Sequence, residues 1–176
     1  MHRVYKLLNS VCFILPLLSY FLITPALCLK PRTAQATERA QDFSLSGVDG
    51  KTYTLAGYRG KVVLLLFWSL DCHPCVKEMP TVAGLKERMK GRPFEVLAVS
   101  EGDSAGRLKK YISRTPLPFP VLMDSDESVG QDRYTVFGLP RAYIIDKNGD
   151  ILEKIPGQND WTAPGNIKKI EEALGK

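Results

Sequence analysis

The chain has 176 residues, of which 44% are hydrophobic, and a formal net charge of +5. This length fits one globular domain with a short appendage. The positive charge is concentrated near the N-terminus, because Arg3, Lys6, Lys30 and Arg32 all precede the first acidic residue, Glu38. The rest is close to neutral and has no basic stripe interleaved with aromatic residues, so the sequence predicts no nucleic-acid partner.

The first 36 residues are typical of a targeting segment. Arg3 and Lys6 precede a long apolar stretch over residues 7–29. A signal peptide has a charged start, an apolar centre of about 7–15 residues and a small-residue cleavage site. A retained membrane anchor is the alternative, because an apolar helix of about 20 residues spans a bilayer. Both interpretations place the domain outside the cytoplasm, on the periplasmic side, with membrane contact only through this segment.

Residues 37–41 are polar and are predicted to link this segment to a domain over residues 42–176. The domain opens with two alternating segments, residues 42–45 and 52–55, joined by the turn signal Asp49-Gly50. This pattern predicts an N-terminal β-hairpin extension.

Beyond the hairpin, predicted strands alternate with predicted helices. The strands cover residues 61–68, 94–100, 119–123, 142–146 and 151–155, and the helices cover a stretch up to about residue 90 and residues 104–114, 127–134 and 162–174. The first strand reads KVVLLLFW, and such a run fits a strand buried on both faces of a mostly parallel sheet. Asn148-Gly149 between the last two strands is a strong hairpin signal. The pattern predicts an α/β fold, a central mixed sheet flanked by helices.

Only two of the four cysteines, Cys72 and Cys75, lie outside the targeting segment. Closing so short a loop removes little entropy from the unfolded chain, so a purely structural disulfide is not expected. The pair follows a predicted buried strand and opens a predicted helix, where partial positive charge stabilises a thiolate. The thiolate is the attacking species in disulfide exchange. The pair therefore predicts redox chemistry, with Cys72 as nucleophile and Cys75 as resolving thiol.

Two neighbours of Cys72 act on its charge in opposite senses. His73, when cationic, favours the thiolate, whereas the carboxylate of Asp71 disfavours it. A zinc site is not predicted, because it needs about four ligands. The only other histidine is His2, in the targeting segment.

From residue 42 to residue 174 the chain resembles the ResA/TlpA-type thioredoxin-like proteins, the exported branch of the thioredoxin superfamily. The shared motifs are Asp42-Phe43, Gly60-Lys61-Val62-Val63, Phe67-Trp68, Cys72-His73-Pro74-Cys75, Lys77-Glu78-Met79-Pro80, Phe119-Pro120-Val121, Gly138-Leu139-Pro140 and Ile145-Asp146. The resemblance implies a thioredoxin-like fold and thiol–disulfide oxidoreductase activity that requires no bound cofactor.

The resemblance also implies roles outside the cysteine pair. Glu78 is expected beneath the site, close to Cys75, where it assists proton transfer to or from that thiol. Pro140 is expected to follow a cis peptide bond opposite the cysteines, with the backbone of Leu139 exposed to an extended substrate chain. The other residues expected to support the site are Trp68, His73 and Pro74.

The chain departs from the family pattern at two positions. Asp71 stands where tryptophan is common, and Arg141 follows Pro140 where threonine is common. We expect Arg141 either to offset the charge of Asp71 or to contact an acidic substrate.

The resemblance implies a reductant of exported thiols, for example in apocytochrome c, that a membrane electron donor keeps reduced. An oxidant that introduces disulfides is the alternative direction. Two other classes are weighed against this one. A peroxiredoxin-like thiol peroxidase would need a lone peroxidatic cysteine, and a metal- or protein-binding module would not need Cys72 for its function.

Overall fold

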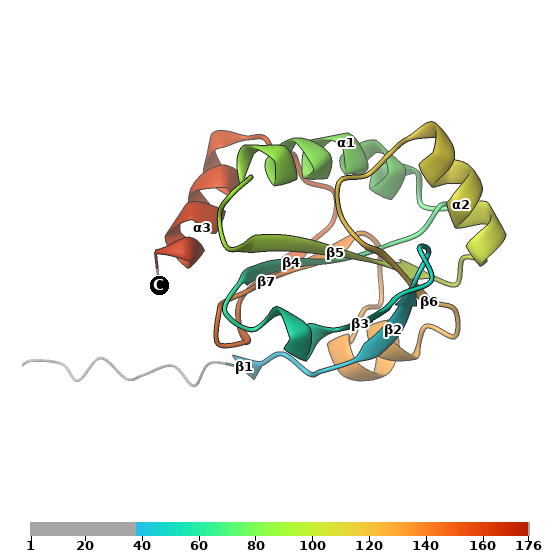
Figure 1. The fold of residues 1–176 in the computed structure, drawn as a ribbon, viewed down its shortest axis with the longest axis horizontal. Helices are drawn as coiled ribbons and strands as arrows, with labels where there is room; N and C mark the ends of the chain where they lie inside the picture. The colour runs from blue at the N-terminus through green and yellow to red at the C-terminus, as the bar shows by residue number, and fades with distance from the viewer. Residues whose placement is uncertain (1–37, 176) are drawn as a thin grey trace, which may run out of the picture. The chain divides into compact units, whose positions relative to one another are not determined.

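The computed structural model describes residues 38–175, which are drawn in colour in Figure 1. The predicted targeting segment lies outside these residues. Within them, no helix is long and apolar enough to cross a membrane.

The described chain forms one mixed sheet of eight strands, in the order β1-β8-β7-β4-β5-β6-β2-β3. The strands are β1 (Glu38–Arg39), β2 (Ser44–Gly47), β3 (Thr52–Thr54), β4 (Val62–Trp68), β5 (Phe94–Glu101), β6 (Val121–Asp124), β7 (Arg141–Ile145) and β8 (Asp150–Pro156). Strands β4, β5 and β6 are parallel, whereas the other neighbouring pairs are antiparallel. The predicted mixed sheet and N-terminal hairpin are confirmed.

Helices cover both faces of the sheet (Figure 1). One face carries α1 (His73–Arg88), α2 (Ala105–Arg114) and α3 (Pro164–Leu174), and the other carries the 3-10 helix η1 (Leu55–Tyr58) and the short π-helix η2 (Val129–Arg133). Ser104 is the N-cap of α2, and its hydroxyl accepts a hydrogen bond from the backbone N–H of Arg107. This cap satisfies one of the free N–H groups of the helix.

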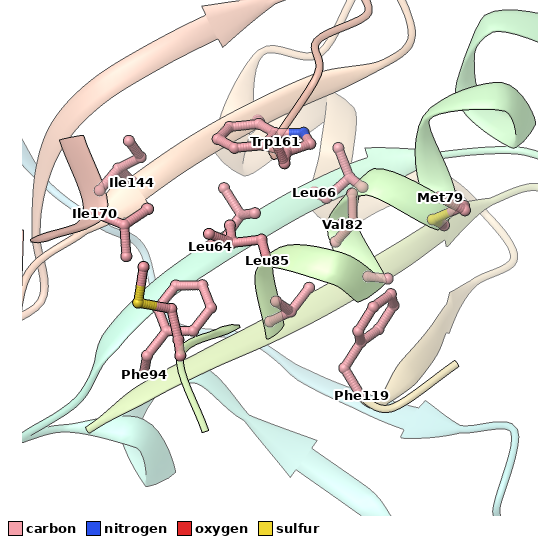
Figure 2. Packing of buried hydrophobic residues seen from close by; sticks show 14 of the residues in the cluster. Leu64, Leu66, Met79, Val82, Leu85, Phe94, Phe119, Ile144, Trp161 and Ile170 are labelled. Atoms are coloured by element: carbon pink, nitrogen blue, oxygen red, sulfur yellow. The ribbon is translucent and has the colours of Figure 1, made fainter. Parts of the chain in front are cut away.

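The apolar run of β4 is explained by burial on both faces. All seven of its residues are buried, and successive side chains point to opposite faces. Leu64 and Leu66 face the helices and pack with Val82 and Leu85 of α1 and Ile170 of α3 (Figure 2).

The alternate β4 side chains form a second core on the opposite face. Val63, Leu65 and Phe67 pack there with Tyr134 and Tyr143. The rings of Phe67 and Tyr134 have centroids 5.2 Å apart. Both cores meet at β4, so the end of this strand is a rigid support for the residues that follow it.

Most element boundaries differ from the prediction by one or more residues, and two of these differences have a clear physical reason. Glu38 and Arg39, in the expected linker, pair with β8 as the edge strand β1, and Ala40 is buried. A strand of two residues is too short for any alternation to reveal. β6 begins at Val121 and not at residue 119, because Pro120 has no N–H to donate to a ladder.

Candidate active site

The cysteine pair lies where β4 gives way to α1. Cys72 is the N-cap of α1, and its Sγ accepts a hydrogen bond from the backbone N–H of Cys75 at 3.3 Å. The two cysteines form a disulfide, with their Cα atoms 5.2 Å apart. Cys72 is partly exposed, whereas Cys75 is 1% exposed. An external thiol or disulfide therefore reaches Cys72 before Cys75.

His73 and Pro74 form the first turn of α1. Proline is tolerated there because the first N–H groups of a helix have no partner within it. His73 is exposed, so its side chain is open to solvent beside the partly exposed sulfur of Cys72.

Glu78 is the buried carboxyl of this helix. It lies three residues after Cys75, so the two side chains occupy neighbouring turns of one face of α1. Its side chain is only 1% exposed, and its Oε1 accepts a hydrogen bond from Nε1 of Trp161. Burial raises the pKa of Glu78 to about 7, although the Trp161 N–H opposes this rise. A carboxyl with a pKa in this range can accept or release a proton near neutral pH.

Trp161 is a site residue that sequence reasoning missed. It is fully buried, and its backbone N–H donates to Oγ1 of Thr81 at 3.1 Å. Thr81 in turn donates to the carbonyl of Glu78 at 2.8 Å. The segment before α3 is thus held against α1. A lone tryptophan in a polar segment was the available signal, because a buried indole N–H requires an acceptor.

Trp68 is the last residue of β4, and its side chain lies in the core. It is fully buried, and its ring lies 5.6 Å from that of Tyr111 on α2, centroid to centroid. The structure therefore places Trp68 in the core under the turn that leads to Cys72, between β4 and the helices.

The charge of Asp71 is offset by Arg107 and not by Arg141, which corrects one expectation. Arg107 donates two hydrogen bonds to the Asp71 carboxylate, at 2.5 and 2.9 Å. This guanidinium lowers the pKa of Asp71. Arg107 also lies 3.1 Å from the buried Asp103, which accepts the backbone N–H of Leu70 at 2.8 Å. The start of α2 thus holds the turn before Cys72.

Arg141 is the first residue of β7 and pairs with Phe67 of β4. Its Nε is buried and has no hydrogen-bond partner. Sequence reasoning did not identify Arg107, because only the packing of α2 against the turn brings residues 36 positions apart together.

The Leu139–Pro140 peptide bond is cis, as predicted. Pro140 directly precedes β7, at the end of the sheet where β4 leads into the cysteine turn. Leu139 and Cys72 pack against the same core cluster. Among residues 38–175, no group of three His, Cys, Asp or Glu side chains is arranged to hold a metal ion.

Comparison with known proteins agrees with this geometry. The model of the AhpC/TSA family matches residues 36–154. The thiol-disulfide oxidoreductase ResA of Geobacillus kaustophilus is 38% identical over 67% of this chain and 67% of its own. ResA of Bacillus anthracis is 33% identical over 77% of this chain and 79% of its own.

Solved structures show the same relationship. The exposed lipoprotein thioredoxin Etrx1 of Streptococcus pneumoniae superposes with a TM-score of 0.63 at 30% identity, covering 77% of this chain and 98% of its own. A provisionally named thiol:disulfide interchange protein DsbE from Chlorobium tepidum gives 0.68 at 29% identity, covering 78% and 94%. The chain belongs to the AhpC/TSA family and, within it, is a ResA-type thioredoxin-like thiol–disulfide oxidoreductase.

Proposed function

We propose that the protein works outside the cytoplasm as a reductant of disulfides in exported proteins, for example in the maturation of apocytochrome c. One observation carries this proposal: a reactive disulfide caps α1, and a buried carboxyl with a pKa of about 7 lies one turn further along the helix. The names of the ResA relatives support thiol–disulfide exchange, and the direction and substrate are our proposal.

The reaction begins with the reduced pair. The Cys72 thiolate, stabilised at the helix N-terminus, attacks one sulfur of the substrate disulfide. A mixed disulfide forms between Cys72 and the substrate, and the other substrate sulfur leaves as a thiolate. Cys72 is the attacking residue because it is partly exposed, whereas Cys75 is buried.

Cys75 completes the exchange. It loses its proton and attacks the Cys72 sulfur, which releases the second substrate thiolate and leaves the disulfide seen in the structure. Two electrons pass to the substrate, and two protons complete its thiols. Glu78, buried on the same face of α1, accepts the proton of Cys75 in this step and returns it when the enzyme is reduced again. A membrane electron donor supplies the two electrons for that reduction.

The substrate chain docks beside the cysteines along the Leu139 backbone. Leu139 is partly exposed and packs on the same core cluster as Cys72. An extended substrate segment can pair there as a short added strand. Arg141, two residues further on in the chain, contacts an acidic group of the substrate at the same edge.

The location rests on two arguments. The first 36 residues have the composition of a signal peptide or an anchor, and Etrx1, a similar protein, is named an exposed lipoprotein. Cell fractionation tests this location. We expect the full-length protein in the periplasmic or membrane fraction, and we expect it to be lost from that fraction when residues 1–36 are removed.

The reduction potential of the purified protein, equilibrated against dithiothreitol or glutathione, tests the proposed direction. A reductant should have a potential of about −270 mV, the value for thioredoxin. A value near about −120 mV would identify an oxidant instead.

A trapping experiment tests the substrate class. Cys75→Ser should accumulate mixed disulfides with exported proteins, and Cys72→Ser, its matched control, should accumulate none. Peroxide consumption faster than disulfide reduction would favour the peroxidase class. Unchanged function in Cys72→Ser would favour a binding module.

A further inference from the structure

A groove of about 400 Å³ lies beside the cis-proline segment, outside the catalytic set described above. Its walls come from the turn after β4, the end of β5, η2 and the segment before β7. The residues that matter here are Ser69, Glu101, Glu127, Gln131, Phe137 and Leu139. Ser69 lies three residues before Cys72, and Leu139 directly precedes Pro140, so the groove borders the reactive end of the domain.

Glu101 is the buried polar group of this groove. Its side chain is 7% exposed, and its Oε1 has no hydrogen-bond partner. The carboxylate packs against Gly130. A side chain at that position would clash with it, because an added Cβ would lie 2.5 Å from both Glu101 oxygens. A buried carboxylate oxygen without a donor costs free energy, so the groove lacks one hydrogen-bond donor.

The surroundings of Glu101 are acidic. Its neighbour across the β5–β6 ladder is Asp124, whose Oδ1 is also buried without a partner. Burial raises the pKa of Glu101 to about 8, together with the charge of Asp124, a hydrogen bond between the Glu101 and Asp124 side chains, and the charges of Glu127 and Asp126. None of the ion pairs formed among residues 38–175 includes Glu101, Asp124 or Glu127. These three carboxyls therefore have no cationic partner there; Glu127 accepts a hydrogen bond from Nε2 of Gln131 at 2.6 Å, and Asp124 accepts one from the backbone N–H of Gly130 at 2.9 Å.

The rim adds an apolar surface. Phe137 is 84% exposed, and it is the exposed large hydrophobic side chain of the described part of the chain. It stands next to Gly138 in the segment that leads to Leu139 and Pro140. An aromatic ring at the mouth of an acidic groove suits a long cationic side chain, because the ring packs on the methylene stem and attracts the charged end.

We propose that this groove binds a lysine or arginine side chain of the substrate, close in sequence to the substrate's reactive cysteine. Glu101 and Glu127 accept hydrogen bonds from the cationic end, and Phe137 covers the stem. The inference rests on the proposed reductase function and adds a preference for substrates with a basic residue near the cysteine. An organic cation is the fitting ligand, because the described side chains provide no group arranged to hold a metal ion.

The test uses peptides with one cysteine joined to mercaptoethanol by a disulfide. A lysine is moved through the positions on either side of the cysteine, and each peptide has a twin in which that lysine is acetylated and uncharged. Pre-reduced full-length protein is mixed with each peptide, and the rate constant for release of the peptide thiol is measured in a single turnover. Reduction oxidises Cys72 and Cys75 and yields the peptide thiol and mercaptoethanol.

We expect the lysine peptide to react about five-fold or more faster than its acetylated twin at one or more positions, the size of a modest ion-pair contribution. Glu101→Gln and Glu127→Gln should each bring this ratio towards one. Glu172→Gln, which removes the same charge from an exposed site on α3, should keep it. If Glu101→Gln proves unfolded by circular dichroism, the Glu127→Gln result decides.

Equal rates for both twins at every position would overturn the inference while leaving the reductase function standing. A ratio that survives in both groove variants would also overturn it. Failure to reduce any peptide, by protein whose Cys72 still reacts with a thiol reagent, would overturn the proposed function together with this inference.

Discussion

Glu78 and Glu101 are both buried carboxyl groups with raised pKa values, yet their surroundings differ. Glu78 accepts the indole N–H of Trp161, and its pKa is raised to about 7 mainly by burial. Each carboxyl has one buried oxygen without a hydrogen-bond donor, but Glu101 also has several acidic neighbours, and its pKa is raised to about 8. Near neutral pH, Glu78 is therefore poised to exchange a proton, whereas Glu101 holds its proton unless a cation replaces it.

This difference shows that a shifted pKa does not by itself define a role. Glu78 shares a helix face with Cys75, so its proton is near the chemistry. Glu101 lines a groove that opens beside Leu139. Asp71 provides the exposed reference, because Arg107 lowers its pKa where burial contributes little.

The largest effect is expected at Glu78. Glu78→Gln keeps the shape of the side chain but removes the group that accepts the Cys75 proton. We expect the rate of resolution of the mixed disulfide at neutral pH to fall by about 100-fold, the lower end of general acid–base contributions. In the wild-type protein this rate should rise with pH through about 7, following Glu78, and in the variant that step should be lost.

Stopped-flow measurement of product release from a preformed mixed disulfide gives this profile. Glu172→Gln is the matched control. A variant that keeps both the rate and the step near pH 7 would assign proton transfer to another group.

The next effect concerns stability. The pKa values of Glu78 and Glu101 are raised from an ordinary 4.5 to about 7 and about 8, so between these limits the folded protein binds more protons than the unfolded chain. Their contribution is present in full below about pH 4.5 and is lost as pH rises towards 8, because stability falls with pH wherever the folded state binds more protons. In Glu101→Gln, the decrease in the free energy of unfolding between low and high pH should be smaller by about 1–2 kcal/mol.

Urea unfolding at about pH 5 and about pH 8 measures the change, with Glu78→Gln as the parallel variant. If Glu101→Gln lost as much free energy of unfolding between about pH 5 and about pH 8 as the wild-type protein, Glu101 would titrate near its ordinary pKa. The contrast between the two carboxyls would then disappear.

A smaller effect is expected at Trp161. Trp161→Phe retains most of the buried ring but removes the N–H that stabilises ionised Glu78. The pKa of Glu78 should rise, and the pH step of the resolution rate should move to higher pH by about one unit or less, the value of one hydrogen bond to a charged group. The thiol pKa of Cys72 serves as the control and should move less. A shift to lower pH would contradict the contact.

The smallest effect is expected at Arg107. Arg107→Ala leaves the Asp71 carboxylate without its partner beside Cys72. The thiol pKa of Cys72, measured by the pH dependence of alkylation, should rise by about a few tenths of a unit, because both partners are solvent-exposed and screened. Adding Asp71→Asn should reverse this rise. A larger rise on Arg141→Ala would restore Arg141 as the relevant cation.

Much of the architecture could be predicted from the order of apolar and polar residues. The KVVLLLFW run predicted β4 because a strand buried on both faces leaves no polar position. The cysteine spacing, directly after that strand, predicted the reactive turn. The short edge strand β1 could not be predicted, because its two residues gain their partners only from β8, more than 100 positions away.

The candidate site divides in the same way. Local sequence was enough for Cys72, Cys75 and the helix position of Glu78, because residues a few positions apart on a helix have a determined relation in space. The partners of these groups were decided by tertiary structure. Trp161 reaches Glu78 from 83 positions away, and Arg107 reaches Asp71 from 36. Burial and long-range charge set the pKa of a carboxyl, and both exist only once the sheet and its helices have closed around it.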